Sequence, residues 1–201
     1  MKIPVVILAG GRATRMGGLD KPLLSLCGQS LLSIILDRLH GQGGPVALNA
    51  NGDPARFASY DLPVLPDSLP DFPGPLAGIL VAMDWAAATG ARQVVTVAGD
   101  TPLFPRDLVA GLAGAAGPQG LALAATREGS DLRDHPTFGL WPVNLRDDLR
   151  ATLAQGQGRV RSFTARHGAV QAIWDAAPFD PFANINTPQD LALTEARLAA
   201  L

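Results

Sequence analysis

The chain has 201 residues with a formal net charge of −2, of which 47% are hydrophobic and 17% are charged. This length and apolar content fit one packed domain, placed at residues 1–201, and they exclude a disordered chain. The slightly acidic balance argues against a nucleic-acid partner, and no apolar stretch is long enough to span a membrane.

Short apolar runs alternate along the chain with longer segments of helical periodicity. Strands are expected at 3–8, 45–49, 62–65, 93–98, 120–126, 137–141 and 170–174. Helices are expected at 30–39, 54–60, 76–88, 105–115, 144–154, 159–167 and 187–200, with Ser30 and Thr187 as N-caps and Pro105 in a first turn. This order predicts an α/β, Rossmann-like domain with a mostly parallel central sheet and helices on both faces.

The single cysteine, Cys27, cannot form an intrachain disulfide, and it is expected to be a buried free thiol. A chain without disulfides is typical of the cytoplasm, which is the expected location. The histidines lie far apart at His40, His135 and His167, so the sequence contains no zinc-ligand spacing.

The segment after the first strand, LAGGRATRMGGLDKP (8–22), is rich in glycine and basic residues. It is not a P-loop, because Lys21 is followed by proline, and it lacks the Gly-x-Gly-x-x-Gly fingerprint. Gly10 and Gly11 let the backbone approach a phosphate closely, and Arg15 and Lys21 can neutralise charge on a triphosphate. A surface turn is the alternative, but this spacing directly after a buried strand favours a phosphate-binding loop.

A second candidate site follows the strand expected at 93–98. A carboxylate there, Asp100, is placed to hold Mg²⁺, which prefers oxygen ligands and shares them with substrate phosphates. An Asp-x-Pro turn explains the same residue equally well from the local sequence. The basic loop elsewhere in the chain favours the metal, because phosphate transfer needs both features.

Further polar residues follow two other strands, namely Asn49, Asn51 and Asp67. The local sequence does not distinguish a ligand-binding role for them from that of ordinary turn residues. Because carboxyl ends of parallel strands meet at one sheet edge, these residues should converge with the glycine-rich loop and Asp100. The sequence has no nucleophile elbow and no Cys/His pair, which favours direct in-line displacement over covalent catalysis.

The stretch LAGGRATRMGGLDKPLL (8–24) resembles the signature loop of nucleotidyltransferases with the GT-A-like Rossmann arrangement. Five further stretches are similar to the molybdenum cofactor guanylyltransferases, also called molybdopterin-guanine dinucleotide synthases. They are LNAN (48–51), DFPGPLAGIL (71–80), AGDTPLF (98–104), HPTFGLW (135–141) and NINTPQDL (184–191). The first loop indicates only the superfamily, whereas the later stretches together indicate this one family within it.

The resemblance implies transfer of GMP from GTP to the terminal phosphate of molybdenum-bearing molybdopterin, with release of pyrophosphate and use of Mg²⁺. It implies catalytic roles for Arg15, Lys21 and Asp100, with Asp100 holding the metal. The implied GTP-binding residues are Leu8, Ala9, Gly10, Gly11, Lys21, Asn49, Asp67 and Asp100. The implied molybdopterin-binding residues are Gly78, His135, Asn184 and Asn186. Molybdoenzyme chaperones are implied as further partners, although no surface signature identifies them.

Two alternatives stay open. One is a cytidylyltransferase that acts on molybdopterin or on another phosphorylated acceptor, because base choice depends on few contacts. The other is a non-catalytic nucleotide-binding domain, against which the presence of both Lys21 and Asp100 argues.

Overall fold

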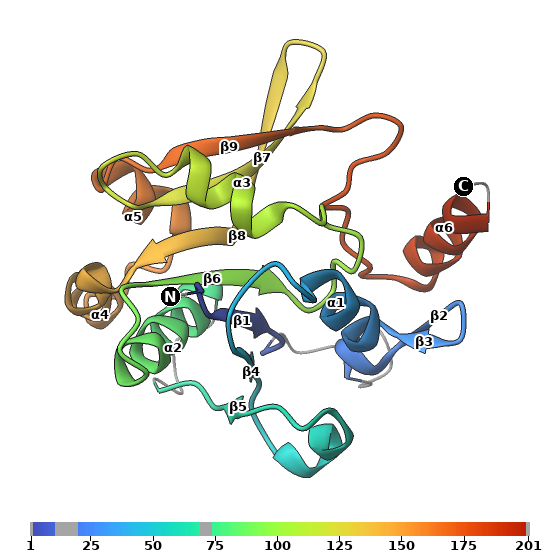
Figure 1. Ribbon diagram of the computed structural model, residues 1–201, viewed down its shortest axis with the longest axis horizontal. Coiled ribbons are helices and arrows are strands. Elements are labelled where there is room, and N and C mark those ends of the chain that lie inside the picture. The colour runs from blue at the N-terminus through green and yellow to red at the C-terminus, as the bar shows by residue number, and fades with distance from the viewer. Residues whose placement is uncertain (1, 11–19, 69–73, 200–201) are drawn as a thin grey trace.

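A seven-stranded sheet with the order β5-β4-β1-β6-β8-β7-β9 runs through the molecule (Figure 1). The computed structural model describes residues 2–10, 20–68 and 74–199. The strands are β1 (Val5–Leu8), β4 (Val46–Asn49), β5 (Val64–Leu65), β6 (Gln93–Ala98), β7 (Ala122–Glu128), β8 (Asp131–Pro142) and β9 (Val170–Asp175). Only β8 runs against its neighbours β6 and β7, so the expected mostly parallel sheet is confirmed.

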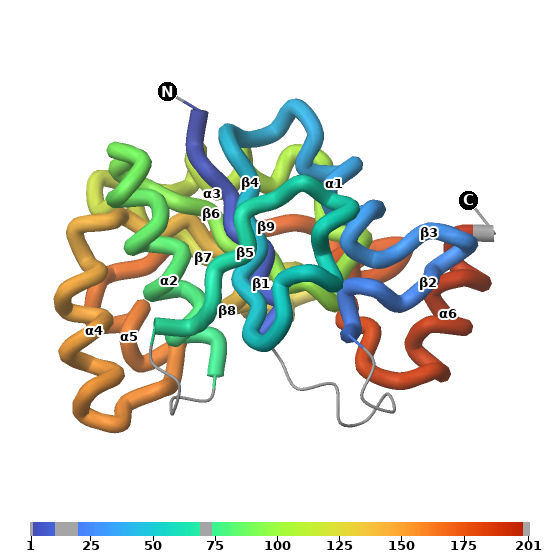
Figure 2. The backbone as a smooth tube through the Cα atoms, turned by 90° about the horizontal axis from the view of Figure 1, so that it is seen from below, coloured from blue at the N-terminus to red at the C-terminus, as the bar shows by residue number. Residues whose placement is uncertain are grey.

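Helices cover both faces of this sheet, as expected. They are α1 (Leu31–Leu39), α2 (Pro75–Ala88), α3 (Leu108–Ala115), α4 (Arg146–Ala154), α5 (Val160–Arg166) and α6 (Pro188–Ala199), with 3-10 helices η2 (Lys21–Leu23), η3 (Pro54–Tyr60) and η4 (Val143–Leu145). Figure 2 shows α2, α4 and α5 gathered on one side, and α1, α6 and the hairpin of β2 (Ser25–Leu26) and β3 (Gln29–Ser30) on the other.

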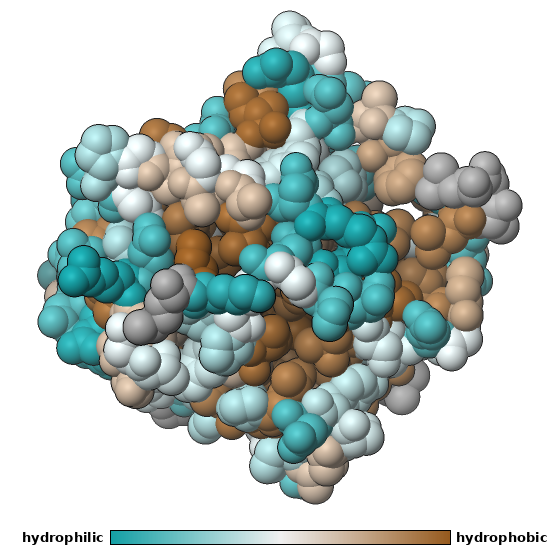
Figure 3. Space-filling model, viewed as in Figure 1, coloured by the Kyte–Doolittle hydropathy of each residue, from teal (hydrophilic) through white to brown (hydrophobic). Residues whose placement is uncertain are grey.

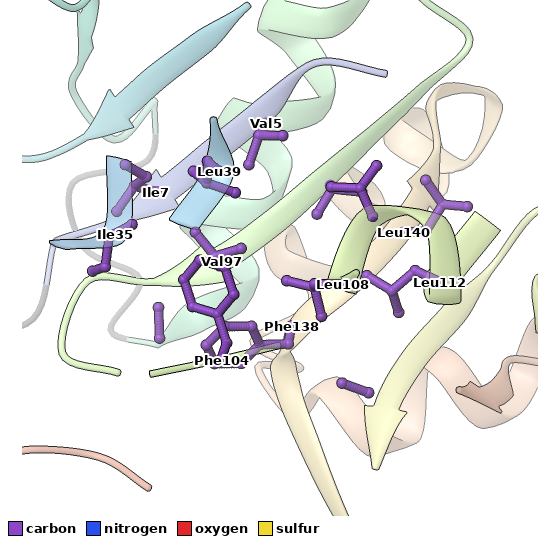
Figure 4. Packing of buried hydrophobic residues seen from close by; sticks show 14 of the residues in the cluster. Val5, Ile7, Ile35, Leu39, Val97, Phe104, Leu108, Leu112, Phe138 and Leu140 are labelled. Carbon is purple, nitrogen blue, oxygen red and sulfur yellow. The ribbon is translucent and has the colours of Figure 1, made fainter. Parts of the chain in front are cut away.

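The alternation of side chains along each strand divides the core into two buried clusters. Val5 and Ile7 pack with α1 and α3, as Figure 4 shows, whereas Val6 between them packs with α2. Each fully buried aliphatic side chain of this kind contributes about 1.5–3 kcal/mol. Because both faces of the central strands are buried, their sequences read as continuous apolar runs.

Hydrophilic residues occupy much of the face in Figure 3, with apolar residues visible mainly in the recesses between them. In the part of the chain that the structure describes, no helix has the length and apolar character needed to cross a membrane.

Two expected elements have different bounds in the structure. The helix expected from Pro105 begins at Leu108, because the Pro105 carbonyl is used in a turn and accepts from Gln42. The strand expected at 137–141 is part of the longer β8, which pairs with β7 as a hairpin. The register shift in that pairing falls beside Pro136, which has no amide hydrogen to donate.

Cys27 is exposed, so the expectation of a buried thiol is wrong. It forms a two-residue turn with Gly28 between β2 (Ser25–Leu26) and β3 (Gln29–Ser30). Both turn residues have positive φ, 51° and 81°, as the primed turns of tight hairpins require. Cysteine is a small apolar residue by type, but here the hairpin geometry decides its position.

Candidate active site

Asn49, Asn51 and Asp67 form a hydrogen-bonded group, called here the amide–carboxylate cluster, at the carboxyl ends of β4 and β5. Asn49 Nδ2 donates to Asp67 Oδ1 at 2.9 Å, and Asn51 Nδ2 donates to Asp67 Oδ2 at 2.7 Å. The Asp67 amide in turn donates to Asn51 Oδ1 at 2.9 Å. Each carboxylate oxygen therefore already has one donor, which fixes the direction in which its remaining lone pairs point.

Two glycines lie against this cluster, and at Gly78 a larger residue would crowd it. A Cβ on Gly78 would lie 2.5 Å from Asn49 Oδ1, and one on Gly10 would lie 3.6 Å from the same atom. The end of β1 therefore meets the cluster, as the sequence predicted for converging loops. Gly78, which the family resemblance assigned to molybdopterin, lies beside the amide–carboxylate cluster.

Lys21 and Asp100 form the second group of the site, the lysine–aspartate cluster. Lys21 Nζ lies 3.2 Å from Asp100 Oδ2 and donates also to Asn186 Oδ1. Both charged side chains are about one-fifth exposed. The structure thus brings together three residues that are far apart in the sequence. The family resemblance assigned Lys21 and Asp100 to GTP and the metal, and Asn186 to molybdopterin.

The segment 176–187 reaches the lysine–aspartate cluster from β9. The Ile185 amide donates to the Asp100 carbonyl at 2.8 Å, and Thr101 Oγ1 donates to Asn184 Oδ1 at 2.7 Å. Asn184 and Asn186 therefore flank Ile185, whose backbone amide is hydrogen-bonded to Asp100. The contact of Thr101 with Asn184 was not predicted, since nothing in the local sequence distinguishes Thr101 from a turn residue.

Asp190 in the first turn of α6 is hydrogen-bonded to the end of this segment. Its Oδ2 accepts from the amides of Asn186 and Thr187, both at 2.9 Å, while its own amide donates to Thr187 Oγ1. This reciprocal pattern is a capping box, and it confirms Thr187 as the N-cap. The hydrogen bond from the Asn186 amide, with further help from Thr187 and the Lys21 charge, lowers the pKa of Asp190.

The oxygen atoms beside Asp100 fit a divalent cation. A positive charge, the Lys21 ammonium, already lies between a carboxylate oxygen and an amide oxygen there. Across residues 2–10, 20–68 and 74–199, no group of three or more His, Cys, Asp or Glu side chains is placed to hold a metal. One carboxylate with amide oxygens and substrate phosphates is the kind of set that Mg²⁺ accepts.

His135 lies on β8 and pairs there with Ala124 of β7. Its ring stacks on Phe182 with centroids 4.6 Å apart, and its Nε2 is 2.9 Å from Thr126 Oγ1. Burial lowers the pKa of His135, although the nearby Asp180 carboxylate acts in the opposite direction. The histidine is 8% exposed and packs against Phe182, in the segment that carries Asn184.

The first loop is described only at its two ends. Gly11 and Arg15 lie outside the described residues, so the expectations for them stay predictions. At the end of β1, the Ala9 amide donates to the Asn49 carbonyl and the Leu8 carbonyl accepts from Gly99. These groups are used in the sheet, so a contact of Ala9 with GTP would engage its carbonyl rather than its amide. The expected contacts of Leu8 and Ala9 with GTP stay predictions.

Comparisons with known proteins place the chain in a family. Residues 5–171 match the model of the MobA-like NTP transferase domain. The chain is 48% identical to a molybdenum cofactor guanylyltransferase of Bradyrhizobium sp., over 99% of this chain and 94% of that protein. It is 50% identical to the protein of the same description from Rhodopseudomonas palustris, over 96% and 90% of the two chains.

Solved structures show the same fold at lower identity. The molybdopterin-guanine dinucleotide biosynthesis protein A of Archaeoglobus fulgidus superposes with a TM-score of 0.74 at 22% identity, over 99% of this chain and 100% of that one. The 4-diphosphocytidyl-2C-methyl-D-erythritol synthase of Anaerococcus prevotii gives 0.76 at 15%, over 98% and 96%. Nucleotidyltransferases of this kind use a divalent metal ion. The chain belongs to the MobA-like NTP transferase family and, within it, to the molybdenum cofactor guanylyltransferases.

Proposed function

We propose that this enzyme transfers GMP from GTP to the terminal phosphate of molybdenum-bearing molybdopterin and uses Mg²⁺ in doing so. The observation that carries the proposal is the arrangement of the amide–carboxylate and lysine–aspartate clusters at one sheet edge, in a chain of this family. The first cluster would bind the guanine nucleoside. The second would bind the phosphates and the metal.

In the reaction, an oxygen of the acceptor phosphate attacks the α-phosphorus of GTP, and the bond to the β-phosphate breaks so that pyrophosphate leaves. A phosphate monoester has a second pKa of about 6, so the acceptor is largely ionised at neutral pH and needs no general base. His135 is buried and stacked on Phe182, and the proposal gives it no role as a base. Lys21 would stabilise the charge that accumulates on the phosphates during transfer.

Asp100 would hold Mg²⁺, with Asn184 or Asn186 contributing an amide oxygen. When bound, the ion would offset negative charge on the triphosphate and help to align it for in-line attack. The Lys21 ammonium contacts the same Asp100 and Asn186 oxygens, so metal binding would turn it toward the phosphates. Asn184 and Asn186 would also face the pterin, with His135 supporting their segment.

A cytoplasmic location and contacts with molybdoenzyme chaperones belong to the same proposal.

The decisive test measures pyrophosphate release with Mg²⁺, GTP and molybdenum-loaded molybdopterin. Release that needs all three is expected, with CTP in place of GTP giving much less. Preference for CTP would point to the cytidylyltransferase alternative. Binding of GTP without turnover on the pterin would point to a non-catalytic nucleotide-binding domain.

A further inference from the structure

Arg56 on η3 joins two segments that are separate in the sequence. Its Nη2 donates to the Asn51 carbonyl, and its Nη1 donates to the Asp53 carbonyl at 2.8 Å. Its Nε lies 2.8 Å from Asp20 Oδ2 without hydrogen-bond alignment, so that contact is an ion pair. One guanidinium group therefore holds the turn after β4 and the residue that precedes Lys21.

Each of these segments carries one cluster of the site. The Asn51 side chain exchanges two hydrogen bonds with Asp67 in the amide–carboxylate cluster. Asp20 directly precedes Lys21, whose ammonium group contacts Asp100 in the lysine–aspartate cluster. Arg56 is therefore placed to set the separation between the nucleoside side and the phosphate side.

The surroundings of Arg56 are shaped to the guanidinium group. Its central carbon lies 4.7 Å from the ring centroid of Phe57, a residue buried in the core. Gly52 has a φ of 85°, and a Cβ there would lie 3.0 Å from Arg56 Nη1. A lysine could place one charge near Asp20, but its single ammonium group lacks the planar fork that reaches three acceptors.

We propose that Arg56 is a positioning residue that fixes the two halves of the nucleotide site at the separation that one GTP molecule requires. The inference rests on the proposed function, since it takes GTP as the ligand that spans both clusters. A ligand with two linked parts binds more tightly than its separate parts when both subsites are held in register. Without Arg56, each half of the site should still bind its own fragment.

The test compares the dissociation constants of GTP, guanosine and inorganic triphosphate, each with Mg²⁺, by isothermal titration calorimetry. Arg56→Gln is expected to raise the dissociation constant of GTP about tenfold, which corresponds to the loss of one charge-assisted contact. It should raise the dissociation constants of guanosine and of inorganic triphosphate by no more than about twofold each, because neither ligand spans the two clusters. KM for GTP should rise while kcat stays within about twofold, and Arg56→Lys should recover part of the loss.

Two further variants separate positioning from general stability. Asp20→Asn removes the charge that Arg56 meets, and the double variant should bind GTP no more weakly than Arg56→Gln alone, because both changes break the same contact. Arg150→Gln is the matched control. It breaks an ion pair of 2.7 Å with Asp84 between α4 and α2, and it should lower the melting temperature while leaving GTP affinity unchanged.

Three results would overturn the inference. The first is that Arg56→Gln weakens the binding of guanosine as much as that of GTP. The second is that the double variant loses more GTP affinity than Arg56→Gln alone. The third is that Arg56→Gln lowers the melting temperature but leaves GTP affinity unchanged. If the wild-type protein itself does not bind GTP, the proposed function fails instead, so the two failures are distinguishable.

Discussion

Asp100 and Lys21 carry opposite charges at the end of β6 and at the start of η2, and in the proposed function the chemistry of the site depends on them. Their contact of 3.2 Å is about one-fifth exposed on both sides, so solvent screens it in part. The pair therefore contributes little to folding stability. Its value lies in holding a carboxylate and an ammonium group ready at the place where metal and phosphates would bind.

Asp100→Ala should abolish Mg²⁺-dependent pyrophosphate release, with a fall in kcat/KM of at least about a hundredfold, because the one carboxylate of the lysine–aspartate cluster is lost. Steady-state kinetics and a thermal melt check this. Asp131→Asn, an exposed carboxylate at the start of β8, is the control and should behave as wild type. Persistent turnover in Asp100→Ala would show that the metal is held elsewhere.

Gly78→Ala should raise KM for GTP several-fold, because the added methyl group would lie 2.5 Å from Asn49 Oδ1. Asn49 is 2% exposed and donates to both Leu65 and Asp67, so it cannot move away freely. Gly114→Ala on α3 is the control. No atom lies within 4 Å of its added methyl group, and the helix should gain up to about 1 kcal/mol. A KM for GTP that stays at the wild-type value would contradict this reading of Gly78.

Among the elements, the segment 176–187 and α6 decide whether the asparagines reach the site. Phe182 is buried against the rings of His135 and Phe138, with centroids 4.6 and 4.9 Å away. At the other end, the capping box of α6 fixes the backbone of Asn186 and Thr187. The segment thus has an apolar anchor before the asparagines and a polar anchor after them.

Asp190→Ala should remove the acceptor of two backbone amides and lower the free energy of unfolding by about 1–2 kcal/mol. Because Asn186 loses its support, KM for the pterin substrate should rise, while the affinity for guanosine stays unchanged. Chemical denaturation and kinetics with each substrate varied in turn check this. Gln189→Ala, an exposed neighbour on α6, is the control. A variant that loses stability but keeps its pterin KM would limit Asp190 to a structural role.

For the whole molecule, the order of the strands creates the site. β1 lies between β4 and β6 in parallel, so Leu8, Asn49 and Ala98 end at the same edge of the sheet. The loops that follow these strands carry Lys21, Asn51 and Asp100. The antiparallel β8 extends the sheet on the other side, and its hairpin with β7 holds His135 against Phe182.

The buried His135 should make stability depend on pH. Burial lowers the pKa of His135, and Arg133 adds to this, while Asp180 and Asp134 partly oppose it. As the pH falls through about 6.5, the usual histidine pKa, the unfolded chain therefore takes up a proton before the folded protein does. Stability should accordingly be fully present above that pH and should fall below it.

His135→Gln should reduce the loss of melting temperature between pH 7.5 and pH 5.5, as thermal melts across this range would show. His40→Gln is the control, because His40 is exposed at the end of α1, and it should keep the wild-type dependence. Equal losses in the His135 variant and the wild type would contradict this account.

Much of the fold could be predicted from the sequence, because its signals are local. Continuous apolar runs placed β1 and β6, helical periodicity placed α1 and α2, and the residue types at 30 and 187 identified both N-caps. The exposure of Cys27 and the start of α3 could not be predicted, because a hairpin turn and a contact with Gln42 decide them.

The sequence by itself determined the residue types that phosphate transfer needs and their places at the ends of strands. It determined that Asp100, Asn49 and Lys21 are available, since residue type and strand ends are local properties. Only the tertiary structure decided that Lys21 meets Asn186, which lies 165 positions away, and that Arg56 joins Asn51 to Asp20. Such contacts depend on strand order and on the direction of each side chain, and a single sequence carries no local signal for either.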